Sequence, residues 1–456
     1  MAGIGFELRK LLKRDSYFSL LQTYAYAGII SSGPWILSII AVIIIGIISV
    51  PVVIPNVQIT QFQISITYLI ALSLIFTGFA QLVFTRYCAD RVFEKEHFRL
   101  LPNLNGLLLV VTVLGGLAAF PLAFTLFPKT SLIFRLLFAS TFVTLSCVWV
   151  AAILLSGLKA YKAILFNFTL GYGCSLGLSF LLRVWGLEGL MLAFLTGQFL
   201  LLMGMLFVVC RNYPSDSFIE FDFLRPGRFH LSLIFIGFFY NLGIWADKFV
   251  FWFHPHTGTQ VIGPLRASEI YDLPVFLAYL SILPGMAVFL VRMETDFVDY
   301  YERFYDAVRE GGSLSYIREM KDEMVRMARE GIYDIIKVQA TATIAVFLMG
   351  RTLLEMAGIP VVYLPLLYID VAGAGFQVVF LGILNVYFYL DRRGRALFLT
   401  MLFTATNFLL SLVSILFGPF FYGYGFAVSL CITILCGMFL LDRDMERLEY
   451  ETFMLQ

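Results

Sequence analysis

Apolar runs recur along the whole chain at ~20 residues each, the length that an α-helix needs to cross roughly 30 Å of hydrocarbon. Of the 456 residues, 60% are hydrophobic and only 14% are charged. A soluble globular chain is about a quarter charged, so this sequence lacks the polar surface that such a fold requires. We therefore predict an all-α polytopic membrane protein.

The apolar runs define about twelve predicted transmembrane helices. Loops rich in Lys and Arg remain on the cytoplasmic side, which fixes the orientation. With Met1 inside, the N-terminus, alternate loops and the C-terminal tail hold about 26 of the 32 Lys and Arg. Both termini are therefore predicted to be cytoplasmic. The predicted spans are residues 22–50, 62–86, 104–127, 131–155, 163–183, 187–210, 231–253, 267–291, 334–356, 361–390, 396–417 and 421–441.

The loops repeat in character every six spans. The links after spans two and eight are charged, whereas those after spans four and ten are short and basic. Two six-helix bundles related by an axis along the membrane normal would produce this pattern, with chance similarity of the loops as the alternative. The predicted parts are an interfacial helix (1–21), a first bundle (22–210), a linker (211–230), a second bundle (231–441) and a tail (442–456).

Residues 292–333, inside the second bundle, are too polar to span a membrane. Two series of apolar residues keep helical spacing on either side of the "GGS" at 311–313. This pattern predicts a cytoplasmic helical hairpin between spans eight and nine. Its apolar face could cover an edge of the protein itself or dock a soluble partner. The partner-docking candidates are Phe297, Tyr301, Phe304, Ile317, Met320 and Met324.

The first residues, "MAGIGFELRKLLKR", have a second amphipathic pattern. Ile4, Leu8 and Leu11 share one helical face, and the basic residues lie elsewhere. Such a helix is typical of segments that lie on the inner leaflet of a membrane.

Several charged residues lie within the apolar runs, where a charge costs at least about 2.5–3.5 kcal/mol unless it is paired or hydrated. Lys248 and Asp272 have similar predicted depths from the outer side, so we predict that they pair, with Glu269 as the competing partner. The outer half of the second bundle is mainly acidic and that of the first mainly basic, which suggests a polar cavity between them. Ion pairs that merely lock helices together are the alternative. The transport-pathway candidates are Asp247, Lys248, Glu269, Asp272, Arg351, Glu355, Asp370 and Arg135.

Two Pro-containing sites predict flexible points in the spans. Pro34, in "GIISSGPWI", removes a backbone donor and clashes with the preceding turn, so it kinks or unwinds a helix. The adjacent serines could satisfy the freed carbonyls. A static kink is the alternative to a hinge that bends during transport. The hinge candidates are Ser32, Gly33, Pro34, Pro284 and Gly285.

The sequence also lacks the motifs of several kinds of catalytic and metal-binding site. No GxxxxGK[ST] loop is present, which excludes ATP hydrolysis by that route. His254 and His256 flank a proline in a predicted outer loop, and two imidazoles fall short of a metal site. We expect no enzyme activity, no cofactor and no metal.

Two stretches carry a family resemblance, namely "MAGIGFELRKLL" and "AYAGIISSGPWILSI". They closely resemble the PelG family, the inner-membrane transporter subunits of Pel exopolysaccharide systems. More distantly, "ADKFVFW" and "GPLRASEIYDLPVF" look like polysaccharide flippases of the multidrug/oligosaccharidyl-lipid/polysaccharide (MOP) exporter superfamily. In those flippases an Asp followed by a basic residue precedes a Gly and then a helix that contains a Tyr. Asp247, Lys248, Gly263 and Tyr271 match this pattern. The 42-residue link over 292–333 is longer than typical flippases carry.

The resemblance implies a fold of two six-helix lobes in a bacterial inner membrane. It also implies export of an aminosugar-rich polysaccharide for the biofilm matrix, together with a cytoplasmic glycosyltransferase and membrane-bound accessory subunits. No nucleic-acid partner is implied. The alternatives are a flippase for lipid-linked oligosaccharide, an ion-coupled drug exporter, and a scaffold that assembles a synthase and transports nothing.

Overall fold

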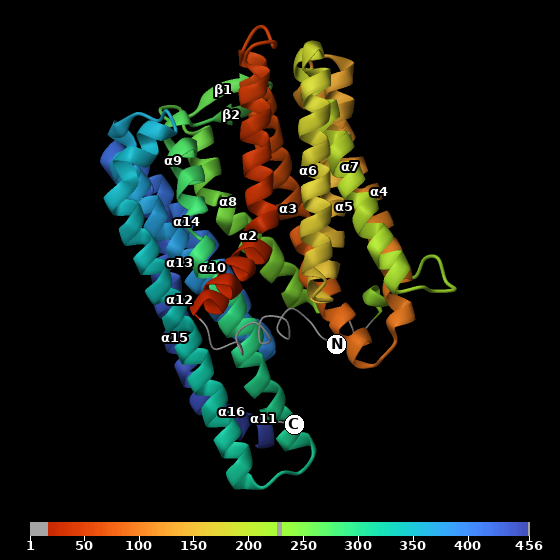
Figure 1. Cartoon of the computed structure of the whole chain (residues 1–456), viewed down its shortest axis with the longest axis vertical. Coiled ribbons are helices and arrows are strands. Elements are labelled where there is room, and N and C mark those ends of the chain that lie inside the picture. Colours follow the sequence, from red (N-terminus) through yellow and green to blue (C-terminus); the bar gives the residue numbers. More distant parts are fainter. Residues whose placement is uncertain (1–16, 226–229, 455–456) are drawn as a thin grey trace. The chain divides into compact units, whose positions relative to one another are not determined.

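The structure is a computed structural model that describes residues 17–225 and 230–454, and it is almost entirely helical (Figure 1). Most of the predicted interfacial helix (1–21) lies outside the described residues. The described chain forms two compact units. The N-terminal unit comprises residues 33–245 and 252–268, and the C-terminal unit comprises residues up to 32, 246–251 and those from 269 onward.

The prediction of an all-α polytopic membrane protein is confirmed. Nine helices of the described chain are long and apolar enough to cross a membrane, or ten if one bent pair is a single span. This count treats residues 161–212 as one helix, although they form the two helices α6 (Tyr161–Leu182) and α7 (Gly186–Asn212). The number twelve, the domain boundaries and the cytoplasmic termini stay predictions.

The N-terminal unit is a bundle of apolar helices. Many of its buried residues are small or β-branched, which suits close helix packing in lipid. Helix α2 begins in the C-terminal unit and continues into this one, while α8 contributes residues to both units. The elements of the unit are α2 (Tyr17–Ser49), α3 (Val57–Phe93), η1 (His97–Arg99), α4 (Leu100–Leu126), α5 (Leu132–Gly157), α6, η2 (Arg183–Trp185), α7, η3 (Asp222–Leu224), α8 (Leu231–Phe253), β1 (Thr259–Ile262) and β2 (Leu265–Ala267).

A short antiparallel hairpin of β1 and β2 follows α8 and was not predicted from the sequence. The hairpin is anchored on α3, where the Tyr68 hydroxyl donates to the Arg266 carbonyl at 2.9 Å. The ring of Tyr68 also stacks on Trp252 with a centroid distance of 4.5 Å. These tertiary contacts explain why four- and three-residue strands form in an otherwise helical chain.

Glycines bring helix backbones of the N-terminal unit together. A Cβ atom added at Gly78 on α3 would lie 2.7 Å from the carbonyl oxygen of Gly237 on α8. A Cβ added at Gly237 would lie 2.2 Å from the carbonyl oxygen of Gly78. Both contacts are with backbone, which cannot rotate away, so only glycine fits this crossing.

We expect Gly78→Ala to destabilise the protein by about 1–3 kcal/mol, the usual cost of overpacking a close contact. The measurement is the thermal unfolding midpoint of the purified protein in detergent. Gly173→Ala on α6 is the matched control, because nothing lies within 4 Å of a Cβ at that position. Alanine there should leave stability unchanged or raise it through helix propensity. Equal midpoints for the two variants would contradict the crossing.

The C-terminal unit is built around α13, whose most apolar stretch is the most buried of the candidate spans. Helix α13 packs against α9, α12 and α15, and Leu367 and Val371 on α13 join Ala278 and Leu354 in one apolar cluster. The elements are α9 (Glu269–Leu280), α10 (Leu283–Val291), the π-helical η4 (Arg292–Phe297), α11 (Val298–Arg309), α12 (Leu314–Met356), η5 (Val361–Tyr363), α13 (Leu364–Tyr389), α14 (Arg393–Phe417), η6 (Pro419–Phe421), α15 (Tyr424–Glu446) and α16 (Leu448–Met454).

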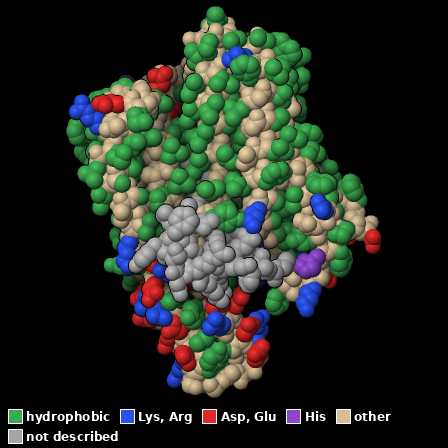
Figure 2. All heavy atoms as spheres, in the orientation of Figure 1, with side chains coloured by type: hydrophobic (Ala, Val, Ile, Leu, Met, Phe, Trp, Pro, Cys, Tyr) green, Lys and Arg blue, Asp and Glu red, His purple; other side chains and the backbone are tan. Residues whose placement is uncertain are grey.

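The helical hairpin predicted at residues 292–333 is present. Figure 1 shows α11 and the first part of α12 side by side in teal, joined by a loop in which Gly311 has a φ of 70°. Charged side chains gather over this end in Figure 2, and hydrophobic side chains cover the helices above it. The structure differs in one respect: α12 is one 43-residue helix, so the second arm continues without a break into the predicted ninth span. No helix-breaking residue other than Gly331 lies at the expected junction.

Candidate functional site

The candidate site is a buried cluster of polar and charged side chains in the C-terminal unit. Its centre is Asp247 and Lys248 on α8, which are 0% and 5% exposed. The Lys248 Nζ atom lies 3.0 Å from Asp247 Oδ2. A charge pair at this depth persists only when hydrogen bonds satisfy its remaining donors and acceptors.

Two neighbouring helices supply those hydrogen bonds. The Tyr271 hydroxyl on α9 donates to Asp247 Oδ2 at 2.6 Å, and Asn407 Nδ2 on α14 donates to Asp247 Oδ1 at 3.2 Å. Lys248 Nζ donates to the Tyr279 hydroxyl at 3.0 Å. The Ser411 hydroxyl in turn donates to Asn407 Oδ1 at 3.2 Å. The pair therefore connects α8, α9 and α14 through one network.

Aromatic rings enclose the ammonium group and the tyrosine network. Lys248 Nζ lies 4.9 Å from the ring centroid of Tyr279 and 4.7 Å from that of Phe426 on α15, both within cation–π range. The ring of Phe251 stacks on Tyr271 with centroids 3.8 Å apart and an interplanar angle of 4°. These contacts exclude solvent and fix the direction in which Tyr271 donates.

Asp370 on α13 is the unusual member of this cluster. Its side chain is 2% exposed, and neither carboxylate oxygen has a hydrogen-bond partner among the described residues. Lys248 and Asp247 are close enough to act on it electrostatically. Gly423, with a φ of 83°, makes room for the carboxylate, because a Cβ there would lie 2.6 Å from Asp370 Oδ1. A buried carboxylate without donors is costly, so an orphaned one in a structure calls for an explanation.

The structure brings three predicted transport-pathway residues together, Asp247, Lys248 and Asp370. The hydrogen bonds described above place the Lys248 ammonium on Asp247 and Tyr279. Its predicted pairing with Asp272, which is 9% exposed on α9, stays a prediction. Among the described residues, no group of three or more His, Cys, Asp or Glu could hold a metal ion.

The other charged candidates lie outside the cluster. Glu269 is exposed at the start of α9. Arg351 and Glu355 pair at 3.0 Å on α12, as their spacing predicts, with side chains 74% and 53% exposed. Arg135 Nη2 in the N-terminal unit donates to the carbonyls of Pro128 and Thr130 at 2.6 and 2.7 Å, so it holds the turn before α5. No described contact gives these four residues a place in a pathway, and that role stays a prediction.

The two hinge candidates differ in geometry. Between α9 and α10 the chain bends by 41° at residues 281–282, directly before Pro284. Gln339 Nε2 donates to the Ser281 carbonyl at 3.1 Å, and Gly285 leaves space for that amide. Pro34 lies inside α2, where the division between the two units falls between residues 32 and 33, next to Gly33. The side chain of Ser32 lies outside what the structure describes. Bending during transport remains a prediction at both sites.

The six partner-docking candidates do not form an exposed face. Five are at most 7% exposed, and Tyr301 is half-buried. Phe297 and Tyr301 pack on the ring of Tyr389 at the end of α13, with centroids 5.7 and 5.4 Å apart. The Glu294 carboxylate accepts from Asn385 and Tyr389 at 3.0 and 3.1 Å in the same region. In this structure the apolar face covers the protein itself, and docking of a soluble partner by these side chains stays a prediction. The buried candidates are Phe297, Phe304, Ile317, Met320 and Met324.

Several residues that complete the cluster were not among the candidates from the sequence, including Tyr279, Asn407, Phe426 and Gly423. Asn407 had a usable signal, since an amide in the apolar run "FTATNFLLS" needs a partner inside the membrane. The aromatic residues had none, because this chain has 47 Phe and 23 Tyr and the spacing of one ring says little.

Solved transporter structures share this fold over nearly the whole chain. A MOP superfamily transporter from Pyrococcus furiosus is 13% identical with a TM-score of 0.61, covering 93% of this chain and 96% of its own. A multidrug resistance MATE family transporter in its outward-facing conformation is 12% identical with a TM-score of 0.63, covering 94% and 97%. A MATE structure in the straight conformation is 12% identical with a TM-score of 0.65, covering 98% and 97%. At this identity the likeness shows the fold alone.

Sequence comparison adds the family. No curated protein matches this chain. A family model described as "PelG: Putative exopolysaccharide Exporter (EPS-E)" matches residues 1–453.

Proposed function

Because this chain belongs to the PelG family of exopolysaccharide exporters and is a multi-pass membrane protein with a MOP transporter fold, we propose that it exports a Pel-type aminosugar polysaccharide across the bacterial inner membrane. The family and the fold are those of transporters rather than enzymes. In this proposal the polymer comes from a cytoplasmic glycosyltransferase, and accessory subunits complete the system. The exported polymer then serves the biofilm matrix.

We further propose that export is coupled to proton movement at the buried cluster. The observation that carries this step is Asp370, a fully buried carboxyl group with no donor to either oxygen. When Asp370 is ionised, two carboxylates of the cluster face one ammonium, and a proton on Asp370 balances the charge of Asp247, Lys248 and Asp370. The cost of burying an unpaired charge gives proton binding a direct effect on packing around α13.

The membrane potential constrains the charge of the polymer. Moving one positive charge outward against an inside-negative potential costs about 2.3 kcal/mol per 100 mV. A cationic aminosugar polymer would meet this cost at every free amine. We therefore propose that the polymer crosses largely N-acetylated and neutral, and becomes cationic only outside the cell.

Transport by the purified protein in lipid vesicles tests the proposal. With an imposed pH gradient, we expect a labelled N-acetylhexosamine oligosaccharide to cross at least several-fold faster than in protein-free vesicles, and the deacetylated oligosaccharide to cross more slowly. Transport of only a lipid-linked oligosaccharide would instead identify a flippase. No transport of either substrate, from protein that retains its fold, would favour a scaffold. A transport rate that does not change with the pH gradient would contradict proton coupling but not export of the polysaccharide.

A further inference from the structure

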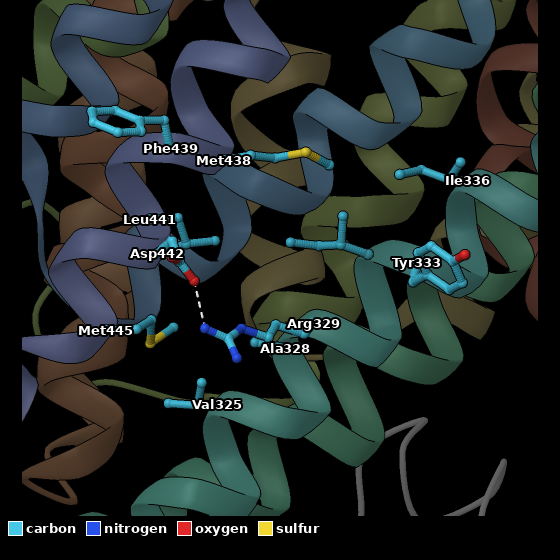
Figure 3. Close-up of a pocket in the computed structure, with 11 residues that line it drawn as sticks. Val325, Ala328, Arg329, Tyr333, Ile336, Met438, Phe439, Leu441, Asp442 and Met445 are labelled. Carbon is cyan, nitrogen blue, oxygen red and sulfur yellow. Dashed lines mark hydrogen bonds and ion pairs between the residues drawn. The ribbon is translucent and has the colours of Figure 1, made fainter.

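An apolar groove of about 390 Å³ separates α12 from α15 in the C-terminal unit (Figure 3). Val325, Ile332 and Ile336 line it from α12, on positions that share one helical face. Met438, Phe439 and Met445 line it from α15. The groove is distinct from the buried ion cluster and from every residue assigned a role in transport above.

The groove lies across the predicted boundary between water and hydrocarbon. On α12 the charged segment ends at Lys337, and residues 338–350 contain no charged side chain. On α15 residues 424–441 are uncharged, and Asp442 is the first charge beyond them. Ile336 and Phe439 therefore lie at the hydrocarbon end, whereas Arg329 and Asp442 lie at the headgroup end.

The headgroup end carries one exposed ion pair. Arg329 on α12 bonds Asp442 on α15, and Figure 3 shows this bond beside the apolar lining. Their side chains are 63% and 56% exposed, so each keeps hydrogen-bonding capacity toward another molecule. A guanidinium group has five N–H donors, and a carboxylate has about four acceptor sites, of which this pair uses only some.

One ion pair ties α12 to the helix that follows α15, and one contact within α12 is typical of a membrane interface. On the side away from the membrane, Lys321 Nζ bonds Glu449 Oε1 at 2.7 Å and ties α12 to α16. Tyr333 on α12, which also lines the groove, is 60% exposed with Lys337 Nζ 4.5 Å from its ring centroid. Exposed tyrosine beside lysine is typical of the membrane interface, where the ring is apolar and its hydroxyl is hydrated.

We propose that this groove binds a phospholipid with a phosphoethanolamine head. One acyl chain lies along Ile332, Ile336 and Phe439, the phosphate accepts hydrogen bonds from Arg329, and the primary ammonium donates to Asp442. The headgroup end of the groove offers one cation, Arg329, and one anion, Asp442, side by side, which matches a zwitterionic head. An anionic glycerol head lacks a cation for Asp442, and a choline head has no N–H to donate to it.

Retention of lipid by the full chain tests this proposal, independently of any transport activity. The protein is purified from a mixture of phosphatidylethanolamine, phosphatidylglycerol and phosphatidylcholine with identical acyl chains, and bound lipid is counted by native mass spectrometry. We expect phosphatidylethanolamine to be retained about tenfold over either competitor, a difference that corresponds to about one charge-assisted hydrogen bond. Equal retention of the three, or a preference for phosphatidylglycerol, would overturn the proposal.

Variants test whether the preference for phosphatidylethanolamine depends on the ion pair of Arg329 and Asp442. Asp442→Asn should remove the preference for phosphatidylethanolamine over phosphatidylcholine, and Ile332→Trp should reduce retention of all three lipids by filling the groove. Arg326→Gln is the matched control, because Arg326 also pairs on α12, with Glu323, but does not line the groove. A loss of preference in Arg326→Gln as large as in Asp442→Asn would show a general surface effect and overturn the site.

Discussion

Replacing Lys248 by methionine is expected to cost about 3–5 kcal/mol of unfolding free energy and to abolish export. The substitution leaves Asp247 buried at 0% exposure with two donors, Tyr271 and Asn407, but no counter-ion. Removing one partner of a buried pair is far more costly than the pair itself is stabilising. The free energy of unfolding, measured by detergent titration in mixed micelles, provides the test.

Two further variants separate the charge effect from packing. Replacing both partners, as in Asp247→Asn with Lys248→Met, should recover most of the lost stability because no uncompensated charge remains. Export should stay abolished in this double variant, since the ionisable pair is gone. Arg351→Met breaks an exposed pair with Glu355 and should cost less than about 1 kcal/mol. Recovery of export in the stable double variant would show that the pair serves the fold alone.

The sequence predicted the architecture well because apolar length is a direct physical requirement of the bilayer. It also located Asp247, Lys248 and Asp370, since a charge inside an apolar run is visible without any structure. It did not predict the network around them. Similar depth predicts a partner for Lys248 on another helix, and that pairing stays a prediction, whereas the contact of Lys248 with the preceding residue, Asp247, was not predicted.

The helical hairpin shows a second limit of sequence reasoning. Helical spacing correctly identified the apolar face that contains Phe297 and Met324, but spacing does not say what covers that face. Both side chains are fully buried, and Phe297 packs on Tyr389, which is 92 positions away in the chain. Only tertiary structure distinguishes a docking face from an internal one, and the sequence left both alternatives open.

Replacing Asp370 by asparagine is expected to lower gradient-driven export at least tenfold while leaving the fold intact. Asparagine has nearly the same shape but cannot exchange a proton, so the cluster would be held permanently in its neutral form. Since neither Asp370 oxygen has a hydrogen-bond partner, the substitution removes no described bond. Relief of the unpaired carboxylate should keep the free energy of unfolding equal to that of the parent protein or raise it.

Asp370→Asn should lower export while the free energy of unfolding stays equal or rises. This combination makes Asp370 the sharper test of coupling. A residue that only supports the fold would lose stability and export together, as Lys248→Met is expected to do. Export of labelled oligosaccharide should respond to the imposed pH gradient in the parent protein and in Glu330→Gln, an exposed acid on α12 that serves as the control. In Asp370→Asn the remaining rate should not respond to the gradient. A parent-like gradient response in Asp370→Asn would place the coupling group elsewhere and leave the buried carboxyl without a role in transport.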